Sequence, residues 1–192
     1  LYGFKHEISK EEVAQRIADN TLLEVTNNVP VHKGDVFFIE SGTLHAIGKG
    51  ILIAEIQQNS NTTYRIYDYG RVGKDGKPRE LHVEKAKEVT KLEPPKYPTT
   101  AQGAPQKIAG GELTLLRSCE YFNVNRLALD GKAELCADEK SFKSLLVLDG
   151  AAELTSAYGA TSLKKGDSVF VDAGTGSFTV SGRADIIITD IV

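Results

Sequence analysis

The chain has 192 residues, with 23 lysines and arginines against 26 aspartates and glutamates, so its formal net charge is −3. This near balance argues against a nucleic-acid-binding face or a polybasic membrane patch, and no apolar run is long enough to span a bilayer. Two cysteines, Cys119 and Cys136, are too few for a disulfide framework or a cysteine-based zinc site. We expect a cytoplasmic protein without nucleic-acid or membrane partners, either a monomer or a weak homodimer.

A short helix is predicted near the N-terminus. Ser9 and Glu12 have the spacing of a capping box, and Ile8 and Val13 have the spacing of a hydrophobic staple. The helix is predicted to run from about residue 9 to Asn20.

Most of the remaining chain has the pattern of short strands. These runs are rich in β-branched or aromatic residues and are bounded by glycine, aspartate or asparagine. Regular short strands with Gly-Asp and Asp-Gly turns favour a sandwich or barrel over alternating strands and helices. The clearest runs are 36–39, 51–56, 145–148, 169–171 and 186–191.

A proline-rich segment divides the chain. Residues 93–105 hold four of the six prolines, which cannot donate a backbone hydrogen bond inside a sheet. We therefore predict one domain over 1–92, a linker over 93–105 and a second domain over 106–192.

The two halves share a repeat. Residues 33–43 match residues 165–175 at a constant offset of 132 positions, both reading as a Gly-Asp turn, a buried strand and a second turn with glycine. The first copy continues to His45, whereas the second has Ser177 at the equivalent position. Folding alone gives little reason for histidine in one copy and serine in its twin, so His45 is a candidate functional residue.

The spacing of Gly34, Glu40, Gly42 and His45 resembles the second motif of the cupin superfamily. In that family the histidine points into a small barrel as a metal ligand, a role that suits neutral imidazole. The first cupin motif is absent from these residues, and one histidine cannot hold a metal by itself.

Three segments that follow one another closely, 41–46, 55–69 and 79–82, narrow the resemblance to class I mannose-6-phosphate isomerases of the short bacterial form. The similarity extends from about residue 5 to the C-terminus. It implies an all-β fold of two cupin-type jelly-roll units, the first incomplete and the second metal-free, with a short helical insertion near the N-terminus.

The resemblance also implies an activity and a set of site residues. The family interconverts mannose 6-phosphate and fructose 6-phosphate through an enediol, and zinc can stabilise the negative charge that develops on oxygen. His45 matches the zinc ligand, Arg65 the active-site arginine and Glu55 an acidic position that could move the proton. Arg71 lies where relatives have a lysine facing the substrate phosphate, and Gln57 is a candidate for binding the sugar.

The family's chain is longer, and its further N-terminal segment supplies the other zinc ligands. This chain begins at Leu1 and contains no methionine, so we expect a fragment that is inactive by itself. One Zn²⁺ is expected for each full-length chain, with the remaining ligands upstream of residue 1.

Other interpretations stay open from the residues themselves. Arg65 could be a strand-edge arginine paired with Asp68, and His82, Glu84 and Lys85 have the pattern of a solvated structural segment. The alternative function is a non-catalytic cupin that binds or senses a sugar phosphate, and a third is a different cupin enzyme such as an iron dioxygenase.

Overall fold

The computed structural model describes residues 1–60, 62–69 and 71–192. The chain divides into two compact units, 1–99 and 100–192, and the boundary falls within the proline-rich segment 93–105. Each unit contains its own hydrophobic core. Across the described ranges, we find no helix with the length and apolar character needed to cross a membrane.

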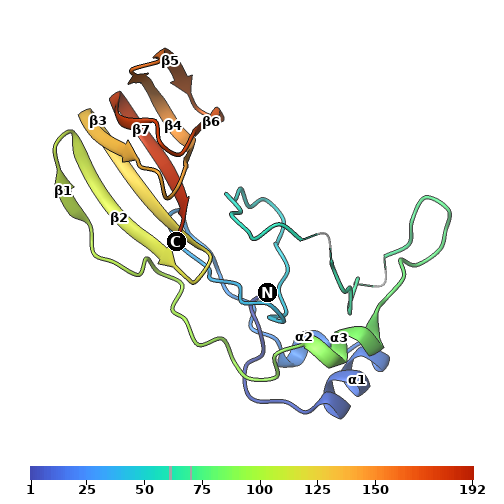
Figure 1. The fold of residues 1–192 in the computed structure, drawn as a ribbon. Helices are drawn as coiled ribbons and strands as arrows, with labels where there is room; N and C mark the ends of the chain where they lie inside the picture. Colours follow the sequence, from blue (N-terminus) through green and yellow to red (C-terminus); the bar gives the residue numbers. More distant parts are fainter. Residues whose placement is uncertain (61, 70) are drawn as a thin grey trace. The chain divides into compact units, whose positions relative to one another are not determined.

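The second unit is a seven-stranded antiparallel sheet (Figure 1). Its strand order is β1-β2-β3-β7-β4-β5, and β6 pairs with the first half of β4 while β5 pairs with the second half. The strands are β1 (Gln106–Ile108), β2 (Gly111–Ser118), β3 (Phe122–Ala137), β4 (Lys143–Ser156), β5 (Gly159–Lys164), β6 (Ser168–Val171) and β7 (Gly176–Ile191).

Glycines let the long strands curve around one core. At Gly182 in β7 (φ 141°) an added Cβ would lie 2.6 Å from the carbonyl oxygen of Ala151, and at Gly150 in β4 (φ 78°) it would lie 2.2 Å from that of Arg183. A side chain cannot occupy either position without moving the backbone. Phe178 and Ile186, which lie before and after Gly182, are both buried in the same cluster.

The strands of this sheet therefore share a single core, as those of a jelly roll do. The strands predicted at 145–148, 169–171 and 186–191 are confirmed within β4, β6 and β7. The all-β, cupin-type fold class is confirmed by this unit. Its fully buried large side chains are Leu127, Leu145, Val147, Phe178, Val180 and Ile186.

The described residues of the first unit form three helices, α1 (Lys10–Ala18), α2 (Leu22–Val25) and α3 (Val83–Val89). The predicted helix is confirmed as α1, and Oγ of Ser9 accepts a hydrogen bond from the backbone N–H of Glu12 at 3.1 Å. Ile8 and Val13, the two staple residues, are 4% and 2% exposed. The remaining buried core residues of this unit are Phe4, Leu22, Val25, Ile66 and Ala86.

The strands expected at 36–39 and 51–56 do not form within the residues that the structure describes. In the second copy, β6 pairs with residues 143–146 of β4, but the positions 132 residues earlier, 11–14, lie in α1. A strand needs a neighbouring ladder, and a helix cannot supply one. Leu52 is left 92% exposed, whereas its twin Ala184 is 7% exposed.

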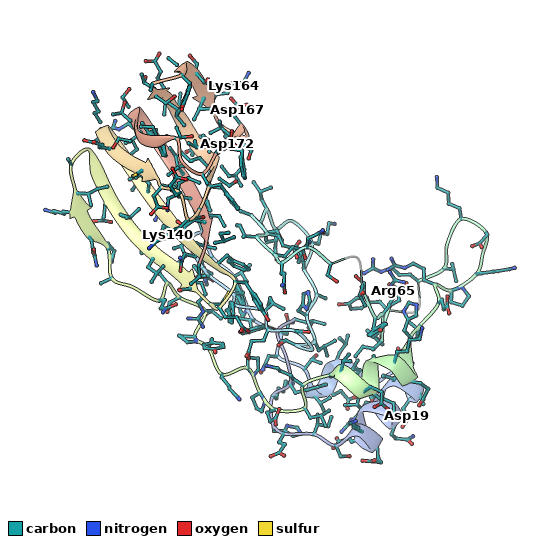
Figure 2. The ribbon with its side chains drawn as sticks, in the orientation of Figure 1. Asp19, Arg65, Lys140, Lys164, Asp167 and Asp172 are labelled. Carbon is teal, nitrogen blue, oxygen red and sulfur yellow. The ribbon has the colours of Figure 1, made fainter. Side chains whose placement is uncertain are left out.

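The turns of the two copies nevertheless have the same hydrogen bonds. Oδ2 of Asp35 accepts from the backbone N–H of His32 at 2.8 Å, and Oδ2 of Asp167 accepts from that of Lys164 at 2.9 Å. At the second turn, Thr43 donates to the Glu40 carbonyl at 3.0 Å, and Thr175 donates to that of Asp172 at 3.2 Å. Figure 2 labels Asp167 and Asp172, which flank β6. The repeat is thus a repeat of turn geometry.

Candidate active site

A cavity of about 250 Å³ lies in the first unit. It brings together the chain start, α2, residues 44–46 after the turn at 40–43, and the segment 62–69, which contains no helix or strand. Among its lining residues are three of the five predicted site residues, His45, Arg65 and Arg71. Its other polar lining residues are Thr26, Thr63, Tyr64, Tyr67, Asp68, Tyr69 and Arg79.

His45 is positioned by the second turn of the repeat. Gly42 has φ 85°, and His45 forms an isolated antiparallel bridge with Tyr2. Nδ1 of His45 lies 2.9 Å from the carbonyl oxygen of Thr43. A carbonyl only accepts, so in the neutral ring Nδ1 carries the proton and Nε2 has the lone pair. The exposed imidazole is therefore prepared to act through Nε2 as an acceptor or ligand.

Arg65, which Figure 2 labels, is held through its backbone. Its N–H donates to Nδ1 of His82 at 3.1 Å, and its carbonyl accepts from the N–H of His82 at 2.7 Å. Nη1 of Arg65 approaches the carbonyl oxygen of Glu80 at 3.5 Å. The next residue, Ile66, is 7% exposed and packs in the core of the unit. Arg65 is thus fixed between the core and the start of α3.

Asp68 forms its ion pair with Arg79, so the alternative pairing of Asp68 with Arg65 is wrong. Nε of Arg79 donates to Oδ2 of Asp68 at 2.7 Å, and Nη2 donates to the other carboxylate oxygen. Asp68 is 8% exposed. The hydrogen bonds from Arg79 lower the pKa of Asp68, and the charges of Arg71 and Arg65 lower it further. Asp68 is consequently ionised at neutral pH.

The cavity has a surplus of positive charge. Arg79 is neutralised by Asp68, whereas the guanidinium of Arg71 lies 4.9 Å from the centre of the Tyr69 ring. Tyr67 contacts Tyr69 edge to face, with ring centres 5.0 Å apart. Arg65 and Arg71 therefore present cationic donors that suit an anionic group such as a phosphate.

Glu55 and Gln57 do not line this cavity. Both are exposed and lie in the segment where the strand predicted at 51–56 is absent. The structure thus brings His45, Arg65 and Arg71 together and leaves Glu55 and Gln57 apart from them.

The described residues do not form a complete zinc site. No group of three or more histidine, cysteine, aspartate or glutamate side chains in that part of the chain could hold a metal ion. A structural or catalytic zinc needs at least three protein ligands. Of the residues that line the cavity, His45 fits the role of a single zinc ligand.

Sequence reasoning did not single out Arg79 or Tyr69 as parts of the site. Tyr69 closes the segment 55–69 and Arg79 opens the segment 79–82, so both lie in the stretches that carried the family resemblance. Their place in the cavity depends on contacts across the chain that neither stretch reveals alone.

Residues 111–191 match the family model described as mannose-6-phosphate isomerase, cupin domain. Over 191 residues, which is all but one residue's length of this chain, the sequence is 39% identical to a mannose-6-phosphate isomerase of Bacillus subtilis, of which it covers 59%. It is 35% identical over 97% of its length to the mannose-6-phosphate isomerase of Streptococcus mutans and covers 58% of that protein.

A solved structure agrees with the sequence matches. The crystal structure of the mannose 6-phosphate isomerase from Bacillus subtilis aligns with 98% of this chain at a TM-score of 0.87 and 33% identity, and 59% of that chain is covered. The chain therefore spans about three fifths of the relatives that it matches. The resemblance of this chain to the mannose-6-phosphate isomerases is confirmed along its whole length.

Proposed function

We propose that the protein interconverts mannose 6-phosphate and fructose 6-phosphate, and that the cavity of the first unit is part of its active site. The observation that carries the proposal is the convergence of His45, Arg65 and Arg71 on one cavity. Relatives named mannose-6-phosphate isomerase match the chain over nearly all its residues. The cavity volume lies just below the ~300–1,000 Å³ of sites for drug-sized ligands, which suits a small sugar phosphate.

The chain's own residues have defined roles in this proposal. The isomerisation moves a proton between C2 and C1 through an enediol, and negative charge develops on the sugar oxygens. Arg65, fixed by its backbone, donates hydrogen bonds to that charge, and Arg71 binds the phosphate. Glu55 is the candidate base and Gln57 a candidate sugar ligand. Because both lie outside the cavity lining, their roles need a direct test.

Zinc dependence is part of the proposal. His45, with Nε2 as acceptor, is one ligand, and the other ligands come from outside the described residues. A cytoplasmic location also belongs to the proposal, and the structure has both cysteines as free thiols.

The test is an isomerase assay on the natural-length protein, with mannose 6-phosphate as substrate and coupled detection of fructose 6-phosphate. His45→Ala is expected to abolish turnover and to remove zinc measured by elemental analysis, and Arg65→Ala is expected to lower kcat about 10²–10³-fold. Glu55→Gln in the same assay tests the base. His32→Ala is the matched control, because the side chain of His32 is 81% exposed and outside the cavity lining.

Binding of mannose 6-phosphate without turnover in the wild-type protein would favour the non-catalytic sugar-phosphate-binding cupin and end the isomerase proposal. Iron in place of zinc would favour a different cupin enzyme. Wild-type turnover by His45→Ala would contradict the role given to His45.

A further inference from the structure

His82 has an unusual position relative to its own helix. It is the N-cap residue of α3, a place where a side chain commonly accepts from the first backbone N–H groups of the helix. Its side chain makes no such bond. Its acceptor nitrogen, Nδ1, instead accepts a hydrogen bond from the backbone N–H of Arg65, 17 residues earlier in the chain.

The contact between the two residues is reciprocal. Nδ1 of His82 accepts from Arg65 at 3.1 Å, and the backbone N–H of His82 donates to the Arg65 carbonyl at 2.7 Å. A backbone N–H can only donate, so Nδ1 must be the unprotonated nitrogen and Nε2 carries the proton in the neutral ring. Both backbone groups of Arg65 are thereby satisfied by one residue.

The partner of Arg65 is itself anchored. The carbonyl of His82 accepts the first intrahelical bond of α3 from Ala86 at 2.9 Å, and Ala86 is 3% exposed in the core of the first unit. The ring of Tyr64, the residue before Arg65, lies 6.1 Å from the ring of His82. The packing of Ala86 in the core therefore fixes the start of α3 and His82, and His82 in turn fixes the backbone of Arg65.

We propose that His82 is a positioning residue for Arg65: its imidazole holds the Arg65 backbone so that the guanidinium faces the substrate. The inference rests on the proposed function, in which Arg65 acts on the developing charge. A group that acts in the transition state loses much of its effect when it is displaced by about 1 Å, so a bond to the backbone can control the rate.

The first experiment needs no variant. In the ¹⁵N-labelled protein, the imidazole shifts of His82 are expected to show the Nε2–H tautomer, and the amide of Arg65 is expected to exchange slowly with solvent. An Nδ1–H tautomer, or an Arg65 amide that exchanges as fast as those of exposed loops, would overturn the inference. Neither readout depends on isomerase activity, so this outcome is separate from failure of the proposed function.

The second experiment uses His82→Leu, which removes the acceptor. We expect kcat to fall about 10–100-fold with little change in KM, and the Arg65 amide to lose its protection. On an Arg65→Ala background the same substitution is expected to cost little further activity, because no guanidinium then remains for His82 to position. His6→Leu, at an exposed histidine in the same unit, is the matched control and should retain wild-type kcat.

A second variant covers the case in which His82→Leu does not fold. His82→Asn keeps an acceptor close to the position of Nδ1 and is expected to retain most of the activity and the protection of the Arg65 amide. An equal loss of kcat from His82→Leu in the two Arg65 backgrounds would show that His82 acts independently of Arg65. Loss of activity in His82→Asn with the Arg65 amide still protected would have the same meaning.

Discussion

The turn before residue 36 and the turn before β6 are held by equivalent hydrogen bonds, yet the chain around them differs. After the second turn, β6 pairs with β4, and β7 pairs with β3 and β4 along its length. After the first turn, the segment 36–39 makes individual backbone hydrogen bonds in place of a strand ladder. Val36 donates to the Thr99 carbonyl at 3.1 Å, and the Phe38 carbonyl accepts from the Tyr2 hydroxyl at 3.0 Å. The same local motif can therefore lead into the strands of a sheet, as in the second unit, or lie beside a cavity, as in the first unit.

The two units also differ in the kind of side chain that lies around the shared turn. In the second unit, positions around the shared turn bury large apolar side chains, and Ser177 stands where the first unit has His45. In the first unit, His45 lines a cavity with Arg65 and Arg71. The second unit uses this part of the chain for its apolar core, whereas the first unit places polar side chains around a cavity, which is the proposed ligand site.

The largest predicted change in the free energy of unfolding is in the second unit. Phe178→Ala removes a ring that is 1% exposed and should lower the free energy of unfolding of the second unit by about 3–5 kcal/mol. Phe170→Ala is the control, since Phe170 is 57% exposed and contacts Phe142 with ring centres 4.5 Å apart, a pair worth about 0.5–1.5 kcal/mol. Urea denaturation followed by far-UV circular dichroism measures both. Similar losses for the two variants would contradict a core filled by Phe178.

A smaller effect tests whether the two turns are equivalent. Asp35→Ala and Asp167→Ala each remove one acceptor of a backbone N–H and should each cost about 0.5–1.5 kcal/mol of folding free energy in their own unit. The matching asparagine variants keep a side-chain oxygen and should cost less. Thermal unfolding provides the comparison. A loss of folding free energy in only one of the two variants would show that the two turns do not contribute equally to stability.

The sequence predicted the parts of the fold that depend on local signals. Ser9 caps α1 through a bond within one turn, and the glycines of the second turn, Gly42 and Gly174, have positive φ in both copies. The sequence-based prediction was wrong where a strand depends on pairing with residues far away in the chain. The segment 36–39 has a strand-forming composition, but the ladder that a strand requires is missing because α1 occupies the twin position of β4.

Helix α3 was missed for a related reason. Its N-cap is His82, which is not a common capping residue, and Ala86 is its one buried side chain. A helix this short depends on tertiary contacts rather than on propensity. The same limit applies to the site. The alternative interpretation paired Asp68 with Arg65, three residues away, whereas its partner Arg79 follows eleven residues later.

The smallest predicted effect concerns the acid range. The ion pair with Arg79 lowers the pKa of Asp68 below the ~3.9 of an unfolded aspartate, so its stabilising contribution is fully present above about pH 4. The contribution is lost as pH falls through the lowered pKa, because the folded carboxylate must then take up a proton.

Asp68→Asn is therefore expected to melt at a lower temperature than the wild type at pH 6, and the difference should shrink as the pH falls from about 4 towards 3. Near-UV circular dichroism of the first unit's tyrosines follows the transition. Asp130→Asn, which alters an ion pair whose side chains are 84% and 71% exposed, is the control and should change Tm little at pH 6. A melting difference that grew on acidification would mean that the Asp68 carboxylate is not stabilised by the folded cavity. The charge balance that leaves Arg65 and Arg71 available to the proposed anionic substrate would then fail with it.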